Sequence, residues 1–104
     1  LKRGAHINLQ NNFGTTALNT AANCGRERMV DVLLQHGAEI GTALVSSAQG
    51  GQERVLDLLL RRGAEIDLRN KITGGTALMH AAAHNRPVVL LRLLRAGADM
   101  TLRD

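Results

Sequence analysis

The sequence is poor in aromatic residues: its 104 residues include one Phe, no Tyr and no Trp. Large rings usually supply much of the buried area of a compact globular core. Apolar residues nevertheless make up 44% of the chain, a fraction ordinary for a folded protein and too high for a disordered one. The composition therefore favours thin layers of Ala, Val and Leu in small stacked units over one large core.

Cysteine, long apolar runs and dense charge are also scarce. Cys24 is the only cysteine, which excludes a disulfide within the chain and fits a reducing compartment. No apolar run approaches the ~20 residues that span a bilayer, and no signal peptide is recognisable. We therefore expect an intracellular, cytoplasmic protein, with a nuclear location as the alternative, and no membrane insertion.

Positive charge is in modest excess, with 13 Lys and Arg against 9 Asp and Glu and a net charge of +4. This surplus favours acidic partners through long-range steering. Basic residues are more frequent in the second half, but no aromatic residue there offers a stacking platform for bases. Nucleic acid is therefore not the expected partner.

Three segments of the chain repeat one another in residue type and in spacing. Each begins at a Thr and has a Gly 21 residues later, as in Thr16 with Gly37, Thr42 with Gly63, and Thr76 with Gly97. Self-similarity on this scale is the signature of repeat architectures. In these architectures each unit buries its apolar face only by stacking on its neighbours.

Each segment predicts two short helices separated by a break. The opening Thr is a good N-cap, because its hydroxyl accepts a hydrogen bond from an unpaired main-chain N–H. The first helix carries small residues such as Ala21, Ala22 and Ala48, and the second is more apolar, as in residues 29–34 and 55–60. The closing Gly stands where a left-handed residue ends a helix. The pattern predicts a solenoid of helix pairs with projecting turns.

The second helix of the third segment departs from the other two. Counted back from the closing Gly, Leu91 takes the place of Asp31 and Asp57, and Arg92 replaces an aliphatic residue. We predict that Leu91 faces solvent and that Arg92 lies with its aliphatic stem across the stack. A shift of the helix that rescues both residues is the alternative.

The segments resemble the ankyrin repeat over essentially the whole chain. The family's Thr-Pro-Leu-His-x-Ala-Ala stretch corresponds to residues 16–22 and 76–82, and more weakly to 42–48. Its Leu-Leu-x-x-Gly-Ala-Asp/Glu ending is present three times. The family's Pro is Ala in all three segments, and its His is Asn19, Val45 or Met79. The resemblance implies a mainly α fold, an ankyrin-repeat solenoid of stacked antiparallel helix pairs joined by β-hairpin-like fingers.

The resemblance places one ankyrin-repeat domain over residues 1–104. We expect the tail of a preceding repeat at 1–7, a repeat at 8–40, a shortened repeat at 41–66, a repeat at 67–100 and the start of a following finger at 101–104. Because the first residue is Leu and partial repeats stand at both ends, we expect an internal segment of a longer array, with neighbouring ankyrin repeats as intramolecular partners.

The connection into the second segment is short. Residues 8–15 lead into the first segment and residues 67–75 into the third, whereas Gly41 alone separates Ile40 from Thr42. Either the second repeat is naturally shortened, or a fingertip is missing from the printed sequence. The flanking residues favour a missing fingertip, which predicts a break between Ile40 and Gly41. A natural deletion would leave a notch in the groove, open to a bulky partner side chain.

No arrangement of residues indicates catalysis. His80 and His84 lie four residues apart on one predicted helix, a spacing that suits a metal, but no further ligand is near them in sequence. Neither Ser46 nor Ser47 has a His or acid partner at a hydrolase spacing. Cys24 stands alone at a helix end, where an inert thiol is the more common reading. We expect no enzyme activity, no metal and no cofactor.

The resemblance also implies a binding surface, because partners of ankyrin proteins usually lie along the concave side. There they contact the fingertips and the exposed face of the first helix. The implied partner-binding residues are Asn12, Phe13, Thr15, Asn23, Cys24, Gln49, Lys71, Ile72, Thr73 and His84, with Gly50 and Ala83 beside them. Phe13 is either an exposed anchor or a ring packed on an adjacent finger.

The expected function is therefore that of a protein–protein interaction module, a scaffold or adaptor that binds a partner protein or peptide. Rigid stacked helices hold variable side chains in place, so that little ordering entropy is lost on binding. The alternative is a structural spacer in a longer array, with binding done elsewhere.

Overall fold

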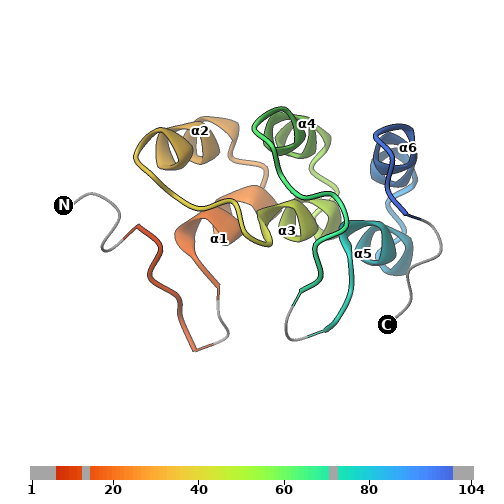
Figure 1. Cartoon of the computed structure of the whole chain (residues 1–104), viewed down its shortest axis with the longest axis horizontal. Helices are drawn as coiled ribbons and strands as arrows, with labels where there is room; N and C mark the ends of the chain where they lie inside the picture. Colours follow the sequence, from red (N-terminus) through yellow and green to blue (C-terminus); the bar gives the residue numbers. More distant parts are fainter. Residues whose placement is uncertain (1–6, 13–14, 71–72, 100–104) are drawn as a thin grey trace.

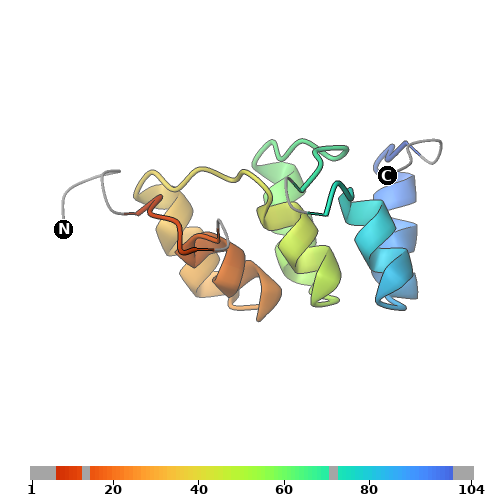
Figure 2. The same cartoon turned by 90° about the horizontal axis from the view of Figure 1, so that it is seen from below.

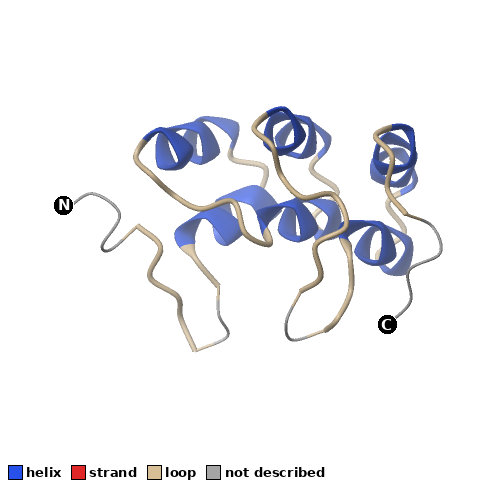
Figure 3. Cartoon of the chain, viewed as in Figure 1, coloured by secondary structure: helices blue, strands red, loops and turns tan. Residues whose placement is uncertain are grey.

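The computed structural model describes residues 7–12, 15–70 and 73–99. Within these ranges the chain forms six helices and no strand (Figure 1; Figure 3). The helices are α1 (Ala17–Asn23), α2 (Glu27–Gln35), α3 (Ala43–Gln49), α4 (Glu53–Arg61), α5 (Ala77–Ala83) and α6 (Pro87–Arg95). None of these helices combines the length and hydropathy needed to cross a membrane.

The helices lie in two rows. Figure 1 shows α2, α4 and α6 in one row above α1, α3 and α5, with α1 packed against α3 and α3 against α5. Each helix of the lower row also packs against the helix that follows it in sequence. Figure 2 shows the three helix pairs succeeding one another along the long axis of a molecule measuring 41 × 25 × 20 Å. The predicted mainly α solenoid of stacked helix pairs is confirmed.

The lower row stacks closely because its buried side chains are small. Ala22, Ala48 and Ala81 are fully buried between neighbouring helices, where longer side chains would force the helices apart. Larger aliphatic side chains fill the space between the two rows, and no aromatic ring is needed there. The largest fully buried ones are Leu18, Leu44, Leu56, Leu59, Leu93, Val30, Val55 and Val89.

The second helix of each pair ends as its closing Gly predicted. The three closing glycines have φ values between 90° and 98°, which is the left-handed region. At the end of α2, the N–H of Gly37 donates to the carbonyl of Leu34 (3.2 Å) and the N–H of Ala38 to that of Leu33 (3.0 Å). These two bonds form a Schellman motif, which satisfies carbonyls that the helix leaves unpaired.

The predicted N-caps hold at two of the three positions. Thr16 accepts a hydrogen bond from the N–H of Asn19 (3.2 Å), and Thr76 accepts one from the N–H of Met79 (3.3 Å). Thr42 makes no such bond, so its prediction is wrong. Both capping residues are extended, with ψ of 171°, whereas Thr42 has a ψ of 17° because a tight turn immediately precedes it.

Two fingers project from the lower row in Figure 1. We call residues 8–12 and 15 the first finger, and residues 67–70 and 73–75 the third finger. The N–H of Asn11 donates to the carbonyl of Thr15 (3.0 Å) in the first, and the N–H of Asn70 to that of Gly75 (2.8 Å) in the third. These bonds close each finger as in a hairpin, although neither finger contains a strand among its described residues.

No finger separates the second helix pair from the first, and the chain is continuous there. Gly41 follows Ile40 directly with a φ of 48°, and the N–H of Ala43 donates to the carbonyl of Ile40 (2.9 Å). This turn is the geometry of the chain as printed, and the missing-fingertip alternative stays a prediction. Because Gly lacks a Cβ, Gly41 adopts the left-handed conformation that lets the chain reverse in one tight turn.

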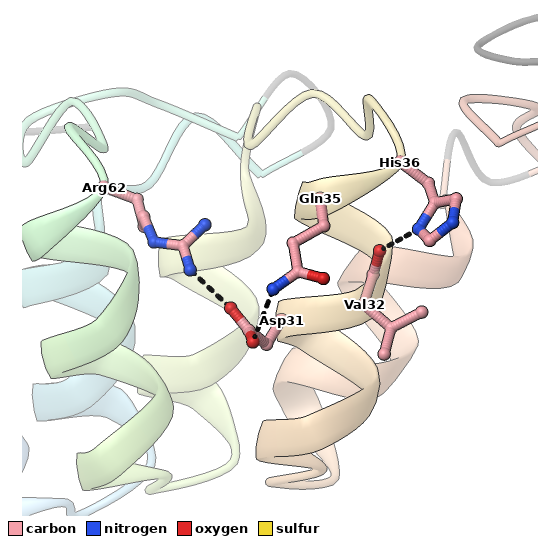
Figure 4. Close-up of polar contacts among 5 residues, drawn as sticks. All are labelled: Asp31, Val32, Gln35, His36 and Arg62. Atoms are coloured by element: carbon pink, nitrogen blue, oxygen red, sulfur yellow. Dashed lines mark hydrogen bonds and ion pairs between the residues drawn. The ribbon is translucent and has the colours of Figure 1, made fainter.

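Ion pairs connect the helices of the upper row. Asp31 of α2 bonds to Arg62, which follows α4, and also accepts from the amide of Gln35 (3.1 Å), as Figure 4 shows. Asp57 of α4 pairs with Arg92 of α6. These side chains are all between a third and a half exposed, so each pair contributes only about 0–1 kcal/mol.

In the third repeat, Leu91 and Arg92 lie as the sequence predicted. Leu91 is 50% exposed, although it occupies the position that Asp31 and Asp57 hold in the other repeats. Arg92 crosses from α6 to α4, where it pairs with Asp57 and with Glu53 (3.4 Å). The prediction for both residues, and the helix register that it assumed, are confirmed.

Candidate functional site

A cleft opens where the second finger is absent. It has a volume of about 580 Å³ and lies between the first finger and the third. Asn8 and Gln10 line it from the first finger, and Leu68, Arg69 and Asn70 line it from the third. Residues of α1, of α3 and of the tight turn before α3 complete the lining. With Gly41 alone between Ile40 and Thr42, the groove of the printed chain therefore has a notch at the second repeat.

The floor of the cleft is held by Asn19, which is buried in the first turn of α1. Its Oδ1 accepts from the N–H (2.9 Å) and the hydroxyl (3.0 Å) of Thr16. Its Nδ2 donates to the hydroxyls of Thr42 (3.3 Å) and Ser46 (3.2 Å) on the next repeat. One carboxamide thus caps its own helix and ties two repeats together, at a position where the family has His.

The rim of the cleft carries side chains that make fewer hydrogen bonds than Asn19. Asn23 and Cys24 are exposed at the end of α1, and Gln49 is half-buried at the end of α3. Asn23 donates through Nδ2 to the carbonyl of Ser46 (3.2 Å). The Oδ1 of Asn23 and the side-chain amide of Gln49 have no hydrogen-bond partner within the described ranges. These groups can donate to or accept from a bound molecule.

The rim is rigid because the ends of α1 and α3 approach each other closely. A Cβ placed on Gly50 would collide with the main-chain carbonyl of Asn23, so only glycine permits this approach. In addition, Gln52 donates through Nε2 to the same carbonyl (3.0 Å), and Arg86 donates through Nε to the carbonyl of Gln49 (3.1 Å). Each helix end is thereby fastened to the repeat that follows it.

The structure brings four of the predicted binding residues together. Thr15, Asn23, Cys24 and Gln49 all line the cleft. Asn12 is exposed on the first finger but does not line the cleft. Thr73, on the third finger, and His84, at the C-terminal end of α5, do not line it either. Phe13, Lys71 and Ile72 lie outside the described residues.

His80 of α5 and His84, which caps the end of this helix, are engaged locally. His80 is buried and its Nε2 shares a hydrogen bond with the hydroxyl of Thr73 (3.0 Å). His84 donates through Nδ1 to the carbonyl of His80 (2.9 Å), and the two rings stack with centroids 5.8 Å apart. Across residues 7–12, 15–70 and 73–99, no group of three or more His, Cys, Asp or Glu side chains could hold a metal ion.

Sequence reasoning missed several residues of the cleft. Glu39 and Ser46 line it beside Arg69 and Asn70, yet these four come from three different repeats. The short spacing between Ile40 and Thr42 signalled a notch, but spacing alone did not show which distant residues the notch would expose. A sequence signal was available only for Asn19, since a carboxamide can replace the hydrogen bonds of the family's His.

Known proteins similar to this chain share its repeats. The chain matches a family model described as ankyrin repeats (3 copies), in two overlapping matches over residues 1–70 and 40–104. It is similar to the ankyrin repeat-containing protein F37A4.4 of Caenorhabditis elegans, with 46% identity over 39 residues. That match covers 38% of this chain and only 3% of the curated relative.

Proposed function

The chain belongs to the ankyrin-repeat family, and we propose that it binds a partner protein or peptide along the concave surface formed by the fingers, α1 and α3. Ankyrin repeats are generally protein–protein interaction modules rather than enzymes. In the parent protein the chain serves as part of a scaffold or adaptor in the cytoplasm. The predicted contacts at Asn12, Thr73 and His84 belong to this surface, as do those at the fingertips.

The observation that carries the proposal is the cleft left by the absent finger. It gathers polar groups that have no partner within the described ranges, namely the Oδ1 of Asn23, the side-chain amide of Gln49 and the thiol of Cys24, on helices that are fixed to one another. A partner that enters it meets groups that need little ordering on binding, which favours affinity. Its volume of about 580 Å³ suits one protruding segment of a partner rather than a broad flat contact.

Charge and the two ends of the stack add further detail to the proposal. The net charge of +4 favours acidic partners through long-range steering. Met29 and Val32 are about half exposed on α2, whereas Val55 and Leu58, their counterparts on α4, pack into the stack. We therefore place a preceding repeat of the parent chain over α2. The repeats are assigned to residues 8–40, 41–66 and 67–100.

A selection experiment tests the proposal. Peptides selected from a displayed random library on the natural chain should lose about tenfold or more in affinity when Asn23 and Gln49 are replaced by Ala, since buried anchors carry most of the binding energy. The matched control replaces Gln35 and His36, which are exposed on the upper row, by Ala. Equal loss in both variants would place binding elsewhere.

The spacer function remains the second candidate. It is favoured by the ion pairs between repeats, which a rigid spacer also needs. A pull-down that compares this chain with its full-length parent separates the two functions. A partner captured by both supports the binding module, whereas capture by the parent alone supports the spacer.

A further inference from the structure

The first residue of each finger performs the same task in two repeats. Asn8 begins the first finger, and its Oδ1 accepts from the N–H of Glu39 (2.8 Å) while its Nδ2 reaches the carbonyl of Gly37 (3.5 Å). Asp67 begins the third finger, and its Oδ1 accepts from the N–H of Asp99 (2.9 Å). In both cases an Asn or Asp side chain ties the base of the finger to the main chain after the second helix of its repeat.

The second repeat has the corresponding main-chain N–H after its second helix, but no finger that supplies an accepting side chain. Glu65 is the counterpart of Glu39 and Asp99, because each stands two residues after a closing Gly. At the other two sites the side chain stands 31 or 32 residues before the N–H that it binds. Counted back from Glu65, these separations lead to Leu34 and Leu33, which lie within α2 and not in a finger. Among the described residues the N–H of Glu65 has no acceptor, and Glu65 is exposed.

The space beside Glu65 shares part of its lining with the cleft. A second hollow, of about 560 Å³, is lined by Glu65, Ile66, Asp67, Leu68 and Arg69. Leu68 and Arg69 also line the cleft that faces α1 and α3. Both hollows therefore border Leu68 and Arg69 of the third finger, and one is lined by Glu65 while the other is lined by Thr42.

We propose that this gap receives a hairpin-like loop of a partner protein, with an Asn or Asp at the base of the loop that accepts from the N–H of Glu65. The inference rests on the proposed function and names the chemistry of its partner. A loop fits because both walls of the gap are fingers and its floor consists of first helices, the surfaces beside which a second finger would lie. The loop takes the place of the absent finger.

A defined peptide tests this inference. The probe carries the sequence of residues 8–15, closed into a hairpin by a disulfide between two cysteines added at its ends. Titrated into isotope-labelled protein, it should shift the amide resonances of Glu65 and Thr42 in a saturable manner. A second peptide with Ala in place of the residue corresponding to Asn8 should bind at least about tenfold more weakly, because the N–H of Glu65 is then covered by the bound loop without an acceptor.

The protein itself supplies a further control. Insertion of a second copy of residues 8–15 between Ile40 and Gly41 fills the gap and should abolish binding of the peptide. Because this variant can fail to fold, its far-ultraviolet spectrum is compared with that of the natural chain. The comparison of the Asn and Ala peptides uses the unchanged protein, so it tests the inference whether or not the insertion variant folds.

Three results would overturn the inference. The first is an absence of shifts at Glu65, and the second is equal binding of the Asn and Ala peptides. The third is a dimer of the chain in sedimentation that blocks the gap with a finger of a second copy. If library peptides bind the natural chain and the filled variant equally, the loop inference fails while the proposed function stands. If no library peptide binds the natural chain, the proposed function fails.

Discussion

Replacing Asn19 by Ala should destabilise the protein more than the replacement of an exposed polar residue does. The substitution removes the two bonds that Oδ1 accepts from Thr16 and the two that Nδ2 donates to Thr42 and Ser46. Asn19 is only 8% exposed, so water replaces these bonds poorly. The helix-capping bond from residue 19 to the Thr16 hydroxyl uses the main chain and persists in the variant.

The size of the effect follows from these contacts. Four bonds at a net ~1 kcal/mol each give a loss of about 4 kcal/mol. Ala is the better helix former by about 0.7 kcal/mol, which offsets part of the loss. Rotation of the freed hydroxyls recovers more, so we expect a decrease of about 2–3 kcal/mol in the free energy of unfolding. For a domain of this size that lowers the Tm by about 10–20 °C.

Urea denaturation monitored by circular dichroism measures this loss, and an unchanged m value shows that both proteins unfold in the same way. The matched control is Asn23→Ala, an exposed carboxamide on the same helix with a single bond to the next repeat. It should cost less than about 1 kcal/mol. A loss at Asn19 no larger than that at Asn23 would refute the role assigned to the buried network.

Further outcomes follow from the packing. Leu91→Asp should change the free energy of unfolding by no more than about 0.5 kcal/mol because Leu91 is exposed. Leu93→Ala should lower it by about 2–5 kcal/mol because Leu93 is fully buried. Equal losses in urea denaturation would contradict the helix register. Gly50→Ala should cost about 1–3 kcal/mol, since its Cβ collides with the main chain of α1, and an unaffected midpoint would show that the helix ends are not in close contact. The chain alone should melt within the ordinary range of about 45–65 °C, because apolar residues of α2 and α6 lie exposed at the ends of the stack; a sharp calorimetric transition above about 80 °C would count against an excised array. The tryptic peptide of residues 29–54 from the natural protein should have the mass of the printed residues if the deletion is natural, and a heavier peptide would support the missing-fingertip alternative.

The parts of the fold that local residues determine were predictable from the sequence. A Gly at a constant distance from a Thr marks each repeat, and its left-handed conformation depends only on neighbouring main-chain groups. The exposure of Leu91 followed from counting positions within one repeat. The failure at Thr42 has a local cause as well, since a one-residue connection leaves no room for the extended conformation that a capping Thr needs.

Contacts between repeats were less predictable because they join residues far apart in sequence. Asp31 and Asp57 are equivalent, yet their arginine partners stand 31 and 35 residues later, at positions that do not correspond. Long flexible guanidinium side chains reach the same place from different turns of a helix. The cleft was hidden for a similar reason, because its walls belong to the first and third repeats and meet only where the second finger is absent.

The alkylation rate of Cys24 reports whether partners enter the cleft of the concave surface. This thiol is the only cysteine of the chain, it is exposed, and it lines the cleft. Its reaction with a maleimide is measured with and without a saturating partner peptide. A Cys24→Ser protein with a cysteine placed at Gln35, on the upper row, serves as the control. We expect the partner to slow alkylation of Cys24 and to leave the control unchanged. An unaltered rate at Cys24 under saturation would show that the partner binds outside the cleft.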